Sequence, residues 1–151
     1  MKDAFGGSFI LRIMIVFFVF FISFMVIAVN FAKTYRVKNG VINILERNVN
    51  SSSSNIRDKK ILPYLNSIGY GPANNRIDQN KISSKYCSVK NNIDTSLLSG
   101  NVYGVCIEPF GEKSSYYYRV TTYMIVNTPF FNLGLYIPIS GETKTFSDVF
   151  Y

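Results

Sequence analysis

An unbroken apolar run extends from Ile13 to Val29, near the N-terminus of the sequence. It holds seventeen residues with no charged side chain and a single hydroxyl group, that of Ser23. A helix needs roughly 20 mostly apolar residues to cross a hydrocarbon core of about 30 Å. Inside lipid, a helix also satisfies every backbone group within its own segment. With its apolar flanks, the run predicts a transmembrane helix over residues 9–32.

Two other interpretations of this run stay open, a cleaved secretory signal and a buried core helix. A signal peptide has an apolar region of about 7–15 residues followed by a small-residue cleavage site. Here the run is longer, and it continues into Val29-Asn30-Phe31-Ala32-Lys33 without that pattern. A core helix would carry a polar stripe, whereas this run is apolar all round. A retained membrane anchor is therefore the preferred interpretation.

Residues 33–47 continue the helical spacing beyond the anchor. Gly40 lowers helix propensity by about 1 kcal/mol relative to alanine, but it need not end the helix. We expect one long helix whose second half lays an apolar stripe on the rest of the protein, with a helix on the membrane surface as the alternative. The apolar residues at three- and four-residue steps are Phe31, Tyr35, Val41, Ile42 and Leu45.

The remaining chain predicts a small head. Residues 48–55 form a polar linker, too poor in apolar side chains to pack, and residues 56–151 form an α+β head. Ile56–Ile68 predicts a short helix that stops at Gly69. Segments rich in β-branched and aromatic residues predict antiparallel strands, with Pro138 marking an edge. These segments are Ile82–Val89, Val102–Ile107, Tyr116–Val126, Leu133–Ser140 and a last short one at Thr143–Phe146.

The fold class follows from these elements. A small antiparallel sheet needs a cover to be stable, and the second half of the long helix is the largest apolar cover that the sequence offers. We therefore expect a membrane-anchored α+β protein. Its long N-terminal transmembrane helix continues as an amphipathic spine that packs on a small, meander-like antiparallel sheet.

The composition excludes several kinds of function. The chain has no histidine, which removes histidine acid–base chemistry and histidine-ligated metal sites. Of the net charge of +7, residues 1–47 contribute six basic and two acidic side chains, and basic residues beside an anchor interact with anionic headgroups. We find no basic run with interleaved aromatics that would indicate nucleic acid, no phosphate loop and no catalytic triad. We expect a non-catalytic protein without a cofactor or metal site.

Cys87 and Cys106 are the one specific chemical pair. A disulfide between them would close a loop of about twenty residues and stabilise the fold by roughly 3 kcal/mol. Such bonds persist outside the cytoplasm. Two buried free thiols remain the alternative. A metal site is not expected, because two cysteines fall short of four ligands.

Gly6 and Gly7 directly precede the apolar run. They act either as a flexible entry or as a processing site, since prepilin-type peptidases cut after a glycine at the cytoplasmic edge of such a helix. Arg12 lies near the start of the run. Its long side chain can reach back to the interface and fix the depth of the helix.

Flanking charge does not decide the orientation of the anchor. Lys2 and Arg12 lie on its N-terminal side, while Lys33, Arg36 and Lys38 follow it. A strict count of basic residues would place the C-terminal side in the cytoplasm. Against this, the cysteine pair favours an exterior head, and long C-terminal domains translocate largely regardless of charge. We expect residues 1–8 to form a cytoplasmic leader and the head to lie outside the cell membrane.

Three local sequences add a family resemblance. They are Ala4-Phe5-Gly6-Gly7-Ser8-Phe9 before the helix, Asn30-Phe31-Ala32-Lys33 to Val37-Lys38 after it, and the late region from Tyr118-x-Val120-x-x-Tyr123 to Ile139-Ser-Gly-Glu-Thr-Lys-Thr145. In these the chain resembles the TadE-like minor pilins, or pseudopilins, of the tight-adherence (Tad/Flp) system of low-GC Gram-positive bacteria. The resemblance implies a single-pass component of a pilus or secretion assembly. Its implied partners are the lipid bilayer, other pilin-like subunits or platform proteins, and a prepilin peptidase.

One position departs from the family pattern. Cleavage after Gly7 would make Arg12 the fifth mature residue, where such pilins usually carry a glutamate thought to neutralise a neighbouring subunit's N-terminal amine. Arginine reverses that charge. The resemblance thus implies a pilus-associated component without establishing a polymerising subunit. A stand-alone membrane-anchored extracellular binding module is the alternative function.

Overall fold

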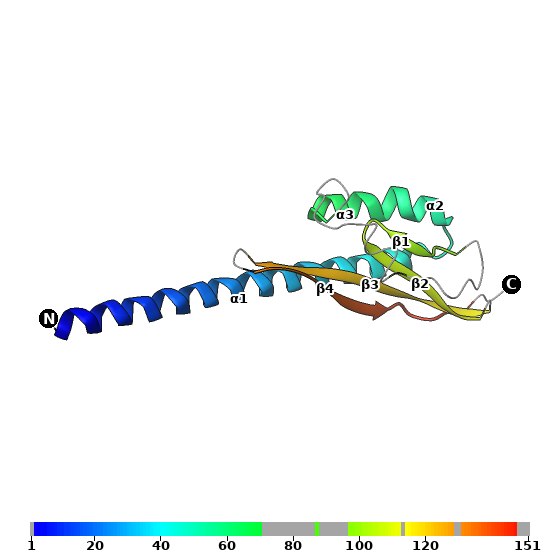
Figure 1. Ribbon diagram of the computed structural model, residues 1–151. Helices are drawn as coiled ribbons and strands as arrows, with labels where there is room; N and C mark the ends of the chain where they lie inside the picture. The colour runs from blue at the N-terminus through cyan, green and yellow to red at the C-terminus, as the bar shows by residue number, and fades with distance from the viewer. Residues whose placement is uncertain (1, 71–86, 88–96, 113, 129–130, 148–151) are drawn as a thin grey trace.

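The computed structural model describes residues 2–70, 87, 97–112, 114–128 and 131–147, and it shows a long helix that projects from a small head (Figure 1). The elements are helix α1 (Lys2–Arg47), helix α2 (Ser53–Asn55), π-helix η1 (Ile56–Ile61), helix α3 (Leu62–Ile68), and strands β1 (Gly100–Val102), β2 (Val105–Glu112), β3 (Ser115–Thr128), β4 (Phe131–Glu142) and β5 (Phe146–Ser147). The expected fold class is confirmed: a long helix packs on a small antiparallel sheet.

The sheet is a meander in the order β1-β2-β3-β4, with β5 paired to the start of β3. In the described part of the chain β4 pairs with β3 on one side, so Pro138 lies in an edge strand as predicted. The predicted strands at Tyr116–Val126 and Leu133–Ser140 are confirmed within β3 and β4. Of the predicted last segment, Thr143–Phe146, only Phe146 lies in β5. The predicted strand Ile82–Val89 lies outside the described residues, except Cys87, which is in no strand.

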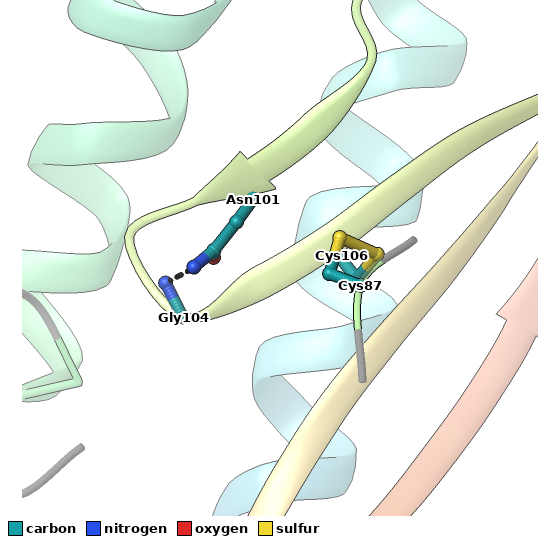
Figure 2. Close-up of a disulfide and its surroundings, with 4 residues drawn as sticks. All are labelled: Cys87, Asn101, Gly104 and Cys106. Atoms are coloured by element: carbon teal, nitrogen blue, oxygen red, sulfur yellow. Dashed lines mark hydrogen bonds between the residues drawn. A yellow bond between two sulfur atoms is a disulfide. The ribbon is translucent and has the colours of Figure 1, made fainter. Parts of the chain in front are cut away.

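The predicted single strand Val102–Ile107 is wrong, because the chain turns back within it. Val102 pairs with Val105, and the two residues between them have positive φ, 52° at Tyr103 and 85° at Gly104. Two-residue hairpin turns need such angles to match the twist of the strands. The Gly104 amide also donates a hydrogen bond to Asn101 Oδ1, at 2.9 Å (Figure 2). The segment is therefore the β1–β2 hairpin.

Helix α1 is continuous through Gly40, as expected, and its second half packs on β3 and β4. The predicted stripe is only partly right. Phe31 and Tyr35 are 51% and 48% exposed, and their rings stack with centroids 6.4 Å apart. The stripe that faces the sheet instead includes Thr34 and Lys38. The hydrocarbon parts of these two side chains pack against the head, and their polar ends reach partners. The buried residues of this stripe are Thr34, Val37, Lys38, Val41 and Leu45.

A second helical segment folds back along α1. It begins at Ser53, so the polar linker expected at residues 48–55 is shorter than predicted. Ile56 and Ile61 are both buried although they are five residues apart. The i→i+5 bonding of the π-helix explains this, because it brings residues of that spacing to nearly the same side. The segment ends as predicted at Gly69, which adopts the left-handed conformation with φ 69°.

Tyr64 docks α3 onto α1 at Gly40. The Tyr64 hydroxyl donates a hydrogen bond to the Arg36 carbonyl, at 3.0 Å. A Cβ atom at Gly40 would overlap the Tyr64 ring and hydroxyl. Nearby, Lys33 Nζ donates to the carbonyl of Gly69 at the C-terminal end of α3, at 3.1 Å. A glycine is therefore required at position 40, because any side chain there would occupy the space of the Tyr64 ring.

We expect Gly40→Ala to destabilise the protein by about 1–3 kcal/mol, the usual cost of overpacking. The change should do so even though alanine has the better helix propensity. In a Tyr64→Ala background the obstacle is gone, so the same change should stabilise the protein by up to about 1 kcal/mol. Denaturant unfolding in detergent micelles, arranged as a double-mutant cycle, measures both effects. An equal effect of Gly40→Ala in the two backgrounds would contradict the docking.

Candidate functional site

The first half of α1 has a surface suited to lipid. From Gly7 the helix is long and apolar enough to cross a membrane, and its most apolar stretch lies outside the head. Phe20 is 73% exposed and Phe9 is 67% exposed. A contiguous apolar surface of this size marks a membrane or protein contact. The structure therefore fits the membrane anchor expected over residues 9–32.

The residues singled out before the anchor lie on this helix. α1 begins at Lys2, so residues 2–8 are helical. Gly6 and Gly7 lie in its first turns, and a Cβ atom at Gly7 would meet nothing within 4 Å. Arg12 is exposed on the same helix. Packing within the described chain therefore does not require glycine at position 7.

The predicted pair Cys87 and Cys106 forms a disulfide bond, with the two Cα atoms 5.6 Å apart (Figure 2). Both cysteines are buried, and they pack with Tyr123 and Tyr136 in a cluster separate from the main core. Cys106 pairs with Thr121 across β2 and β3, on the face opposite to the α1-facing residues Val120 and Thr122. The bond therefore fastens Cys87 onto the face of the sheet away from α1.

Tyr70 is a structural residue that the sequence interpretation missed, since its surroundings look like a loop. Its buried hydroxyl donates to the Tyr123 carbonyl at 3.1 Å and accepts from the Tyr123 amide at 3.2 Å. Burial raises the pKa of Tyr70 to about 12. The side chain thus ties the chain after α3 to the middle of β3. No local pattern distinguishes this tyrosine from the chain's ten others.

An aromatic and charged cluster lies on the outer face, which we define as the face of β2–β4 away from α1. The rings of Phe110 and Tyr117 stack with centroids 5.8 Å apart, and the Arg119 guanidinium lies 4.3 Å from the Phe110 centroid. Arg119 Nη2 donates to Glu142 Oε1 at 2.9 Å, and this bond raises the pKa of Arg119. The outer face thus carries partly exposed aromatic rings beside an ion pair.

The described residues hold no group of three or more His, Cys, Asp or Glu that could bind a metal ion. An open groove lies on the side of α1 where α3 docks. Its polar lining groups are amides, tyrosine hydroxyls and one guanidinium, which suit hydrogen bonding to a partner. The lining residues are Ala32, Tyr35, Arg36, Asn39, Gly40, Asn43 and Tyr64.

We expect the double variant Cys87→Ala/Cys106→Ala to unfold with roughly 3 kcal/mol less free energy, given the loop that the bond closes. Reduction of the unmodified protein should produce a similar loss, measured by denaturant unfolding in detergent micelles. Reductant should have no effect on the double variant, which serves as the control. A double variant as stable as the disulfide-bonded protein would contradict this role.

We expect stability to fall as the pH rises from 10 to about 12. Unfolded tyrosine loses its proton near pH 10, whereas buried Tyr70 keeps its proton to about pH 12. The unfolded state therefore binds fewer protons in this window, and Tyr70 contributes a decline of up to about 1.4 kcal/mol per pH unit. Tyr70→Phe should reduce the decline and cost about 1–3 kcal/mol at neutral pH through lost hydrogen bonds. Part of the decline should remain in Tyr70→Phe, because burial also raises the pKa of Tyr118 to about 12. An unchanged slope in Tyr70→Phe would contradict the assignment.

No family model matches this sequence, and no curated protein or solved structure is significantly similar to it. The features that bear on function are therefore the apolar anchor helix, the disulfide-bonded head, the outer face and the groove beside α3.

Proposed function

We propose that this protein is a non-catalytic, single-pass membrane pseudopilin that serves as a minor or accessory component of a Tad-type pilus or secretion assembly. The proposal rests on the difference between the two halves of α1. Its first half exposes an apolar surface, and its second half is built into the core of a meander sheet. Such a helix can pack beside other membrane helices while it presents the head on one side of the bilayer.

The disulfide supports an N-terminus in the cytoplasm and a head outside the cell. The Cys87–Cys106 bond belongs to an oxidising compartment. Two of the three basic residues just after the anchor also have structural partners. Lys33 caps α3 at the Gly69 carbonyl, and Lys38 Nζ lies 4.3 Å from the centroid of the Tyr35 ring. These contacts account for basic residues at the exit of the helix without a role in setting its orientation.

Arg12 supports a low-copy role. If the chain is cut after Gly7, the new amine at Ser8 and the guanidinium of Arg12 lie one helical turn apart and carry the same charge. Repetition of identical subunits would bring such groups together in a medium of low dielectric, where repulsion is strong. A subunit that primes, caps or assists an assembly avoids that arrangement.

The outer face supports a second candidate, a stand-alone membrane-anchored extracellular binding module. The stacked Phe110 and Tyr117 rings and the Arg119–Glu142 ion pair would then form the binding surface. In this alternative the anchor only tethers the head, so the protein needs neither processing nor pilin partners.

Intact-mass measurement of the protein co-expressed with a prepilin peptidase separates the two functions. We expect the mass to fall by that of residues 1–7, and we expect Gly7→Val to block this cleavage. A loss of residues 1–6, which Gly7→Val need not block, would place the cut after Gly6. Gly7 is exposed and free of neighbours around its Cβ position, so the substitution leaves the head intact. Cleavage would also place the N-terminus in the cytoplasm, on the side where the peptidase cuts.

The matched control is Ile10→Val, a conservative change at another exposed site of the same helix, which should be processed normally. A full-length mass in cells whose peptidase processes its own pilin would contradict the pseudopilin proposal. That result would favour the binding module.

A further inference from the structure

Arg36 differs from the two other basic residues at the exit of the anchor. Lys33 Nζ is bound to the Gly69 carbonyl, and Lys38 Nζ lies over the Tyr35 ring. The Arg36 side chain is exposed, and it forms no ion pair with an acidic residue in the described part of the chain. A guanidinium offers five N–H donors in a planar fork. Arg36 is therefore available for an anionic ligand.

The groove beside α3 places other polar groups near Arg36. Its volume is about 510 Å³, which is in the range of small-ligand sites. The Tyr64 ring forms its α3 side, held by the hydrogen bond from the Tyr64 hydroxyl to the Arg36 carbonyl. Asn39 and Asn43 add amide donors from α1, and none of the lining residues is acidic. The groove is thus suited to a small ligand with negative charge.

The groove begins where the expected anchor ends. Ala32, the last residue of that segment, lines it, and Arg36 lies about 6 Å further along α1. The headgroup layer extends about 5–8 Å beyond the hydrocarbon core on each side of a bilayer. Side chains on a helix also tilt towards its N-terminus, which here is the direction of the anchor. The Arg36 guanidinium is therefore at the level of lipid phosphates.

Two aromatic residues support this level. Phe31 and Tyr35 are 51% and 48% exposed, and their rings stack on each other. Amphipathic aromatic rings such as that of tyrosine are enriched at the interface between hydrocarbon and water. Tyr35 also lines the groove. The membrane boundary indicated by these rings thus coincides with the end of the groove at Ala32.

We propose that this groove binds the headgroup of an anionic phospholipid, in the leaflet on the side of the head. The Arg36 guanidinium donates charge-assisted hydrogen bonds to the phosphate. The Asn39 amide lies about 4 Å further from the bilayer, where it donates to the polar group beyond the phosphate. The acyl chains lie along α1 next to Ala32. The inference rests on the membrane anchoring in the proposed function, and it requires no pilin partner.

Charge and level together select this occupant. A phospholipid phosphate is anionic and is held at the depth of Arg36, so binding does not require a ligand from solution. Basic pockets beside membrane helices bind anionic headgroups in this way. The contact would also give Arg36 a role that its two basic neighbours fulfil within the protein.

A single tryptophan beside the groove tests the inference, because the chain contains no tryptophan. Phe31→Trp keeps an aromatic ring next to Tyr35. The full-length, disulfide-bonded variant is reconstituted into vesicles of phosphatidylcholine with a minor fraction of phosphatidylglycerol. Bromine is carried on the acyl chains either of the phosphatidylglycerol or of an equal amount of the phosphatidylcholine. Fluorescence quenching then compares the two lipids at the same site.

We expect quenching to show phosphatidylglycerol enriched about fivefold over phosphatidylcholine, which corresponds to about 1 kcal/mol for one basic residue near an anionic surface. Adding Arg36→Gln should abolish this preference, and Arg36→Lys should retain part of it. The Arg36 side chain is exposed, so neither change should alter thermal unfolding.

Arg47→Gln is the matched control, because it removes the same charge from an exposed site of α1 about 16 Å further from the membrane. It should keep the preference. Equal quenching by the two brominated lipids, or a preference that survives Arg36→Gln, would overturn the inference and leave the anchor intact. If bromine on all of the phosphatidylcholine does not quench the tryptophan, the anchoring itself fails. A preference that inorganic phosphate removes, and that chloride at the same ionic strength does not, would assign the groove to soluble phosphate and also overturn the inference.

Discussion

The packing of α1 on the sheet forms the core of the head. Val37, Val41 and Leu45 are almost fully buried and belong to one core with Val120 and the return segment Ile56–Ile68. A small meander cannot remain folded with an open apolar face, because too little of its surface would be buried. The helix that covers this face is also the anchor. Folding of the head and attachment to the membrane are therefore properties of one element.

The opposite face of the sheet is stabilised by different chemistry. A small cluster around the Cys87–Cys106 bond and Tyr123 takes the place of a second helical layer. From the side of the main core, the Tyr70 hydroxyl holds the backbone of β3 at Tyr123 through two hydrogen bonds. A covalent bond and buried hydrogen bonds suit a head of this size, because its single apolar core is too small to exclude water on both faces.

The sequence predicts the general form of the fold well because its strongest patterns are long. The apolar run and the spacing after it predict one helix through Gly40. The density of aromatic and β-branched residues predicts β3, and strict alternation predicts β4. The disulfide partner also follows once a bond is assumed, since the chain has two cysteines. Each of these patterns persists over many residues or leaves a single choice.

The errors fall where tertiary contacts outweigh local pattern. Phe31 and Tyr35 have the right spacing, but the sheet approaches α1 on the side of Thr34 and Lys38. The turn at Tyr103–Gly104 lies inside a run that reads as strand. Ile56 and Ile61 meet the core together only because the helix widens there, and Tyr70 finds its partner 53 residues away. Local periodicity carries none of this information.

The continuity of α1 has a mechanical consequence. No joint separates the part of the helix in the bilayer from the part inside the head, so the two turn as one body. From residue 32 to residue 47 the helix rises about 22 Å, and a tilt of about 20° would move its far end sideways by about 8 Å. A partner that pushes on the head would therefore change the tilt of the helix in the membrane. A change in bilayer thickness, which alters that tilt, would displace the head.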